Sequence, residues 1–341
     1  MVDIAPDGPV HDGPRPRIVC VGANEESLIS LRGLIDHQAS VVGLVTLDPS
    51  RRDDLSDYVD LAPVAAEHGL ACVRTVDIND AATIHALRAL EPDFVFTLGW
   101  SQLMSDEVLA IPSGYVVGSH PSLLPAGRGR APVPWTIILG ERRGAVSLFR
   151  MVRGADAGPL LIQRPFDVPA GIDAGALYRL VSETMRDAYR DLYSALASGQ
   201  VTETPQSEAD ATYRAGRVPA DGHVDFGRPR EEIDRLVRAV SRPFPGAYAY
   251  LRAEPVHIWR SDLSDVPAYV GTPGQVLAKR AGRLLVQAGD GPLWLSDLTV
   301  DGAPVDDDHI RIGDRFGFRI EDELFRLRQE VAHLKARVQD P

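Results

Sequence analysis

A histidine and an acid, both in turn-rich sequence, are the residues of this chain best suited to chemistry. His120 begins the run His-Pro-Ser-Leu-Leu-Pro, and Asp156 lies in Gly-Ala-Asp-Ala-Gly further along the chain. A histidine beside a carboxylate can move a proton at neutral pH, because the free imidazole has a pKa of about 6.5. Each residue follows an apolar run, and loops at the ends of such runs commonly carry catalytic groups. The sequence therefore predicts an acid–base pair.

The elements that must position this pair follow an alternating pattern. Apolar runs typical of strands alternate with helical spacing of leucines, which predicts βαβ units, right-handed crossovers and a mostly parallel sheet. Strands are expected at 17–23, 41–47, 71–74, 93–100 and 114–117, then at 145–152 and 160–168, with helices near 24–35, 55–67, 80–90, 105–111 and 174–197. Ligands of such sheets bind beyond the carboxyl ends of the strands, and Trp100 and His120 fall at two of those ends.

The second half of the chain has a different pattern. Residues 201–222 are polar and are expected to form a linker after a catalytic domain at 17–200. Short alternating runs with glycine turns, after a helix near 230–240, predict a small β-rich, OB-like barrel at 223–318. The last segment, 319–341, is expected to be an amphipathic helix. Its apolar residues recur at spacings of 4, 3, 4, 3 and 4: Ile320, Leu324, Leu327, Val331, Leu334 and Val338. This seam could dock on its own domain or form a homodimer.

Composition excludes several classes of protein. With 36 basic and 48 acidic residues the net charge is −12, which disfavours nucleic acid as a partner. No apolar run approaches the ~20 residues of a membrane span. The proline-rich segment 1–16 has no apolar signal core and is expected to be a flexible leader, so the expected location is the cytoplasm. Cys20 and Cys72 lie in apolar runs, are expected to be buried and have no clustered partners, so no metal site is expected.

One combination of motifs resembles a known family. Gly118-Ser-His-Pro-Ser-Leu-Leu-Pro125 is followed by Arg128-Gly-Arg-Ala-Pro132 and then by Arg153-Gly-Ala-Asp-Ala-Gly158. This order resembles the folate-dependent formyltransferases, whose pattern is Asn-x-His-x-Ser-Leu-Leu-Pro, then Arg-Gly-x-Ala-Pro, and later Asp-x-Gly. The segment Arg242-Pro-Phe-Pro-Gly246 is similar to the start of the family's carboxyl-terminal domain. The chain looks most like the branch that formylates amino groups of nucleotide-linked sugars.

The resemblance implies a fold, a reaction and a set of residues. The fold would be a Rossmann-like formyltransferase domain followed by the β-rich domain. The reaction would transfer a formyl group from 10-formyltetrahydrofolate to the amine of a nucleotide-linked amino sugar, with His120 as acid and base and Asp156 orienting its ring. Trp100 and Leu103, with Gly118 and Asp156, would line the donor site. The acceptor site would be shaped by the motif and the segment after it: Ser122, Leu124, Pro125, Arg128, Arg130 and Pro132.

The chain departs from the family pattern at one position. The catalytic asparagine of the family falls on Gly118, and losing one oxyanion donor typically costs about 100- to 1000-fold in rate. Ser119 or a bound water could replace the missing donor, or the charged imidazole of His120 could act alone. Otherwise the chain transfers another one-carbon or acyl group, accepts a different amine, or only binds a ligand.

Overall fold

The computed structural model describes residues 15–341, except 56, 253, 307–308, 318–319 and 340–341. Almost all of the predicted leader, 1–16, therefore lies outside the described residues. The chain divides into two compact units. The first runs to Thr136 and resumes at Glu141–Arg217, and the second combines Ile137–Gly140 with the chain from Val218 onward. Each unit is described by itself below.

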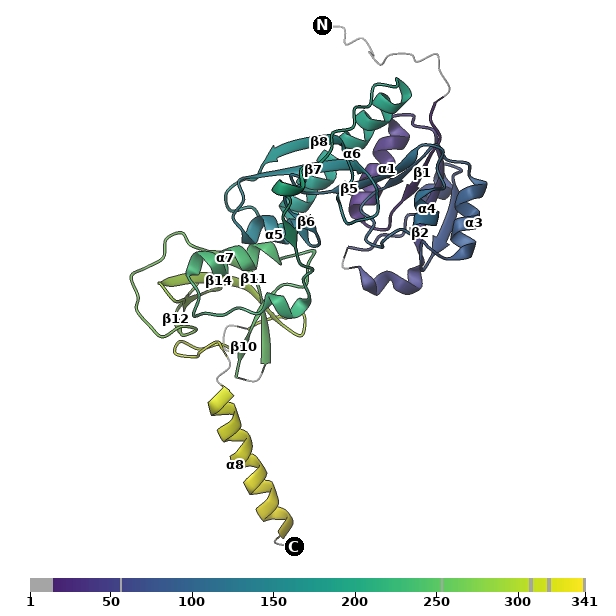
Figure 1. Ribbon diagram of the computed structural model, residues 1–341. Helices are drawn as coiled ribbons and strands as arrows, with labels where there is room; N and C mark the ends of the chain where they lie inside the picture. Colours follow the sequence, from purple (N-terminus) through teal and green to yellow (C-terminus); the bar gives the residue numbers. More distant parts are fainter. Residues whose placement is uncertain (1–14, 56, 253, 307–308, 318–319, 340–341) are drawn as a thin grey trace. The chain divides into compact units, whose positions relative to one another are not determined.

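A seven-stranded mixed sheet forms the centre of the first unit (Figure 1). The first five strands run parallel, and the last two are antiparallel to their neighbours. The order across the sheet is β3 (Ala71–Thr75), β2 (Val41–Leu47), β1 (Ile18–Val21), β4 (Phe94–Thr97), β5 (Tyr115–His120), β7 (Arg143–Arg150) and β8 (Leu160–Asp167). The prediction of a mostly parallel sheet is confirmed. β5 is longer than predicted, and His120 is its last residue.

The helices of this unit largely follow the predicted spacing. They are α1 (Glu25–Asp36), α2 (Ala62–Glu67), α3 (Ala81–Ala89), α4 (Asp106–Leu109), α5 (Pro132–Ile138) and α6 (Ala174–Ala197). Asn24 caps α1 by accepting from the backbone N–H of Ser27, whose side chain completes a capping box. The helix expected near 55–67 is shorter than predicted, because a 3₁₀ turn at Pro49–Asp54 precedes it and α2 begins at Ala62.

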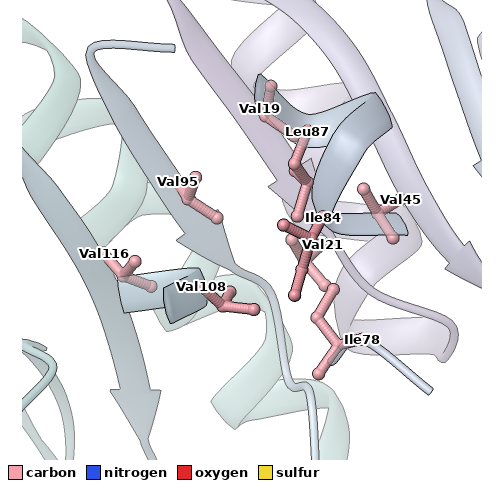
Figure 2. Close-up of a cluster of buried hydrophobic side chains, with 9 residues drawn as sticks. All are labelled: Val19, Val21, Val45, Ile78, Ile84, Leu87, Val95, Val108 and Val116. Carbon is pink, nitrogen blue, oxygen red and sulfur yellow. The ribbon is translucent and has the colours of Figure 1, made fainter. Parts of the chain in front are cut away.

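A buried valine-rich layer fixes which residues of β5 face which side. Val116 of β5 packs with side chains of β1, β2 and β4 against Ile84 and Leu87 of α3 and Val108 of α4 (Figure 2). Alternate residues of a strand face the same side of a sheet, so Gly118 and His120 continue this face, whereas Ser119 belongs to the opposite one. The thiol of Cys20 is buried as predicted, but Cys72 is exposed, because β3 is the edge strand of the sheet.

The segment predicted as a linker belongs to the first unit through Arg217. Thr204 exchanges backbone hydrogen bonds with Leu160 at the start of β8. Further along, β9 (Tyr213–Arg214) pairs in parallel with β6 (Arg128–Gly129), which directly follows the predicted catalytic loop. A short 3₁₀ turn, Glu208–Asp210, lies between these attachments. Polar composition suggested a spacer, but its hydrogen-bonding groups are used to hold two other loops.

A strand-rich barrel forms the second unit. It contains α7 (Arg230–Ala239) and the strands β10 (Ala247–Leu251), β11 (Glu254–Asp262), β12 (Val276–Arg280), β13 (Arg283–Gln287), β14 (Pro292–Val300) and β15 (Ala303–Pro304). Residues 313–317 bond both to Tyr250 at one edge and to Gly274 and Val276 at the other, so they bridge the two edges of the sheet. The last helix is α8 (Ile320–Gln339). No helix in the described part of the chain is long and apolar enough to cross a bilayer.

Candidate active site

His120 is buried at the carboxyl end of β5, and its two ring nitrogens have different partners. Nε2 lies 2.8 Å from the carbonyl oxygen of Gly127. A carbonyl can only accept, so Nε2 carries the proton and Nδ1 of the neutral ring keeps its lone pair. Nδ1 lies 3.7 Å from Oδ2 of Asp156, which is beyond hydrogen-bonding distance but close enough for a strong charge interaction. The predicted acid–base pair is thus assembled in space.

Burial and charge act in opposite directions on this imidazole. Removal from water lowers the pKa of His120 below its usual value, because it disfavours the charged ring. The carboxylate of Asp156 acts to raise the same pKa, and the guanidinium of Arg214 acts to lower it. The net direction is down, so the ring is neutral near pH 7 and available as a base.

Asp156 is held by backbone and amide donors rather than by the histidine. Its backbone has φ of +53°, a left-handed conformation that aspartate tolerates better than most residues. Its Oδ2 accepts a hydrogen bond from the backbone N–H of Gly129 at 2.9 Å. Its carbonyl oxygen accepts one from Nε2 of Gln206 at 2.8 Å, and the same amide nitrogen donates to the carbonyl of Gly158 at 2.6 Å. Its side chain remains 19% exposed, so the carboxylate can be reached from solvent.

Gln206 also connects the acid to Arg128. The fully buried guanidinium of Arg128 donates to Oε1 of Gln206, to the carboxylate of Glu208 and to the hydroxyl of Tyr213. These bonds occupy the guanidinium within the protein, which argues against its predicted place in the acceptor site. Sequence reasoning missed Gln206, because no local pattern marks a glutamine that bonds to loops 50 and 78 residues away.

The space beside Gly118 is filled by other side chains. A Cβ atom at this position would lie 2.6 Å from Cζ of Phe149 and 3.0 Å from Cγ of Met151. Phe149 lies directly opposite Gly118 in the ladder between β5 and β7. Carbon atoms do not approach so closely, so the family's asparagine would not fit unless Phe149 moved. The corner that holds an amide in the family pattern is apolar here.

Ser119 does not lie on this face. Its hydroxyl donates to the carbonyl oxygen of Thr97 at 3.0 Å, and that oxygen also accepts from the hydroxyl of Tyr189 in α6. The serine therefore points from the sheet toward α6, away from the face that carries His120. This placement argues against the prediction that Ser119 replaces the missing donor.

The remaining predicted acceptor residues surround the loop after His120. The hydroxyl of Ser122 donates to the carbonyl of Ala126 and so closes the turn, while Leu124 is buried and is joined to Pro125 by a cis peptide bond. Pro132 begins α5, and its carbonyl accepts from Arg214. Arg130 has an exposed side chain, with its backbone N–H bonded to Arg214. Of the two arginines predicted for the acceptor site, Arg128 and Arg130, only Arg130 presents its side chain to solvent.

Two of the four predicted donor-site residues, Trp100 and Leu103, lie in the loop after β4, whereas Gly118 lies on β5 and Asp156 beside His120. Trp100 packs against the valine-rich layer, and its indole N–H is buried with no acceptor among the described residues. Leu103 is 78% exposed, which is unusual for a leucine. Among the residues that the structure describes, no group of three His, Cys, Asp or Glu could hold a metal ion.

Two family models match this chain. The formyl transferase model matches residues 23–192, and the model of the formyl transferase C-terminal domain matches residues 218–306. The chain belongs to the formyl transferase family. Within this family's amino-terminal domain lie His120, Asp156 and Gly118, and the barrel corresponds to its carboxyl-terminal domain.

Several solved structures share the fold at low identity. HypX from Aquifex aeolicus, in complex with tetrahydrofolic acid, is 18% identical with a TM-score of 0.61, over 90% of this chain and 51% of that one. The chain thus spans about half the length of HypX. An N-formyltransferase from Helicobacter canadensis, in complex with folinic acid and dTDP-3-aminofucose, is 15% identical with a TM-score of 0.62 (83% and 99% covered). Methionyl-tRNA formyltransferase from Clostridium thermocellum is 14% identical with a TM-score of 0.52 (84% and 98%).

Proposed function

We propose that this chain transfers a formyl group from 10-formyltetrahydrofolate to a primary amine. The observation that carries the proposal is the pair of facing acceptors, Nδ1 of His120 and Oδ2 of Asp156, 3.7 Å apart. Nε2 of His120 is already committed to Gly127, so Nδ1 is the free position of the ring. A primary amine has two N–H groups and can donate to both acceptors at once. The pair is therefore suited to hold an attacking amine and to remove its proton.

The residues of the chain divide the work as follows. The donor supplies an electrophilic formyl carbon, to which the amine nitrogen forms the new bond. Nδ1 of neutral His120 takes the proton that the amine loses, and the charge of Asp156 stabilises the resulting imidazolium. The protonated ring then returns this proton to the nitrogen of the donor, from which the formyl carbon separates. Trp100 and Leu103 are the residues proposed to hold the pterin.

We infer that the acceptor is an amino sugar on a nucleotide. Arg130 supports this choice, because an exposed guanidinium near the catalytic loop can bind a phosphate oxygen. A net charge of −12 disfavours a long polyanion such as tRNA, but a short diphosphate could bind to one local cation. The family resemblance to sugar N-formyltransferases points in the same direction.

The apolar corner at Gly118 favours a second candidate. Without an amide beside the reacting carbonyl, the protonated imidazole must stabilise the oxyanion alone, and formyl transfer would be slow. A fold that kept His120 and Asp156 but lost this donor could transfer another acyl group or only bind a folate. The contacts of Phe149 and Met151 with the Gly118 position are the observation behind this alternative.

The test is a panel of acceptors with one formyl donor. The purified chain is mixed with 10-formyltetrahydrofolate and with nucleotide-linked amino sugars or initiator methionyl-tRNA, and products are followed by mass for the gain of one formyl group. His120→Asn should abolish the gain, and Arg130→Ala should raise KM for phosphorylated acceptors without changing kcat, whereas Arg143→Ala, another exposed arginine, is the matched control. If the donor binds and no amine gains a formyl group, the second candidate replaces the first.

A further inference from the structure

The terminal helix α8 exposes a continuous apolar seam. Four large side chains of the seam are each about half exposed: Leu324 (50%), Leu327 (44%), Val331 (47%) and Leu334 (51%). The end positions, Ile320 and Val338, have side chains outside the described residues. A lone helix of this length is marginal in water, and large aliphatic residues on one of its faces add no stability unless another surface covers them.

The spacing of the seam defines a heptad register. Spacings of 4 and 3 place Leu324 and Val331 at position a, and Leu327 and Leu334 at position d. Val331 at a, with leucine at the d positions on either side of it, is the combination that favours two-stranded coiled coils, whereas Leu324 at a does not discriminate. Figure 1 shows α8 as one continuous helix, so no break interrupts this register.

The charged residues beside the seam indicate what covers it. In this register Glu323, Glu330 and Arg337 occupy position g. Position e is occupied by Glu321, Arg328 and Lys335. In a parallel pair, each g residue faces the e residue five positions later on the partner helix. Glu323 would then face Arg328, and Glu330 would face Lys335, so every such pair has opposite charges. An antiparallel pair with Leu324 opposite Leu334 would instead place Glu330 beside Glu330 and Arg328 beside Arg328, where like charges repel. Its outer contacts, Glu323 with Arg337 and Glu321 with Lys335, would be attractive, so the two central repulsions are what favour the parallel pair.

We propose that α8 pairs with α8 of a second copy of this chain as a parallel, in-register, two-stranded coiled coil. A second copy in the same register supplies both a matching seam and these complementary charges. Glu323 also bonds to Arg326 of its own helix, and its side chain is 23% exposed. The proposal is independent of the reaction at His120, because none of these residues belongs to the catalytic site.

The first test measures mass in solution across a range of concentrations. We expect a dimer of about 74 kDa, twice the 37.0 kDa of one chain. Leu327→Glu places a charge in the seam and should raise the dimer dissociation constant at least 100-fold, while Gln329→Glu, on the outer face of the same turn, should leave it unchanged. A monomer at every concentration, or a dimer that Leu327→Glu does not weaken, overturns the proposal.

Charge reversal tests the register. Glu323→Lys with Glu330→Lys makes positions g and e alike in charge and should weaken the dimer on the order of 100-fold at low salt. Adding Arg328→Glu and Lys335→Glu reverses both sides and should restore affinity to within about threefold. Failure of the fourfold variant to recover overturns the predicted pairing, and circular dichroism checks that each variant keeps its helix.

Disulfide trapping tests the orientation. Cys72→Ser removes the exposed native thiol, and Cys20 is buried, so an introduced cysteine is the reactive one. In a parallel pair Leu324→Cys faces itself and should form an interchain disulfide on mild oxidation. In an antiparallel pair it would face Leu334, so a mixture of Leu324→Cys and Leu334→Cys chains would give the mixed disulfide alone. That second outcome overturns the parallel arrangement.

Discussion

Placing asparagine at residue 118 is the sharpest perturbation of the candidate site. The substitution Gly118→Asn restores the family pattern, but its Cβ would lie 2.6 Å and 2.9 Å from ring atoms of Phe149 and 3.0 Å from Cγ of Met151. Phe149 is buried and lies on a strand, so its ring has little room to withdraw. We expect overpacking to destabilise the first unit by about 1–3 kcal/mol, which corresponds to a fall in melting temperature of roughly 2–12 °C.

A second substitution separates the steric effect of the new side chain on stability from the effect of its amide on kcat. Phe149→Leu removes the ring atoms that the new side chain would meet and keeps most of the apolar bulk. The double variant should therefore be more stable than the sum of the two single effects predicts, by about 0.5–3 kcal/mol. If its amide reaches the developing oxyanion, kcat should exceed that of Phe149→Leu by about 100- to 1000-fold, with little change in KM.

The assays are thermal unfolding and steady-state formyl transfer. The structural reasoning is refuted if Gly118→Asn alone melts like the wild type, because the space would then be open. It is also refuted if the single variant alone accelerates the reaction. A stable double variant with unchanged kcat would show instead that the site stabilises the oxyanion through the imidazole and has no use for the amide.

The remaining predictions concern proton positions and their supports. The lowered pKa of His120 predicts that kcat/KM stays high below pH 6.5, and Asp156→Asn, which removes the charge that raises this pKa, should move the acid limb to still lower pH. Gln206→Leu should lower kcat about 10- to 100-fold and shift the acid limb of the pH profile, whereas Glu208→Gln, which changes another partner of Arg128, should lower only the melting temperature. Burial raises the pKa of the Glu26 carboxyl from 4.5 to about 8, because the folded protein favours the neutral acid. The free energy of unfolding is therefore highest below pH 4.5, where the carboxyl is neutral in both states, and it falls as the pH rises through 8. Chemical denaturation should find Glu26→Gln more stable than the wild type at pH 9, by up to about 5 kcal/mol, and similar to it at pH 4.

The parts of the fold that depend on local pattern could be predicted from the sequence. The capping residue of α1, the length of α6 and the alternation that makes a parallel sheet all follow from residues close together in the chain. The edge position of β3 does not, because strand order is decided by crossovers, and so the exposure of Cys72 was missed. The same limit applies to the segment around Thr204, whose pairing with β8 is invisible in its polar composition.

The candidate site divides along the same line. His120 and Asp156 were found because their motifs are local, and the structure brings them within 3.7 Å. What surrounds them could not be found in that way. Ser119 could replace the missing oxyanion donor only if it lay on the same face of β5 as His120. The structure places its hydroxyl on the opposite face, bonded to the carbonyl of Thr97.

The interpretation of Gly118 changes once the residue opposite it on β7, Phe149, is taken into account. In the sequence alone, Gly118 shows only that the asparagine of the family pattern is missing. Opposite Phe149 it becomes a requirement, because only glycine leaves room for that ring. Loss of the asparagine and filling of its space are thus two halves of one change, and a reversion must alter both residues. A chain that had simply decayed would be expected to leave a cavity or a water-filled gap beside His120. Because the space beside Gly118 is filled by apolar side chains, both proton transfer and stabilisation of the oxyanion depend on His120 and Asp156. The pH profile of kcat/KM tests the proton transfer, and the double variant tests the stabilisation of the oxyanion.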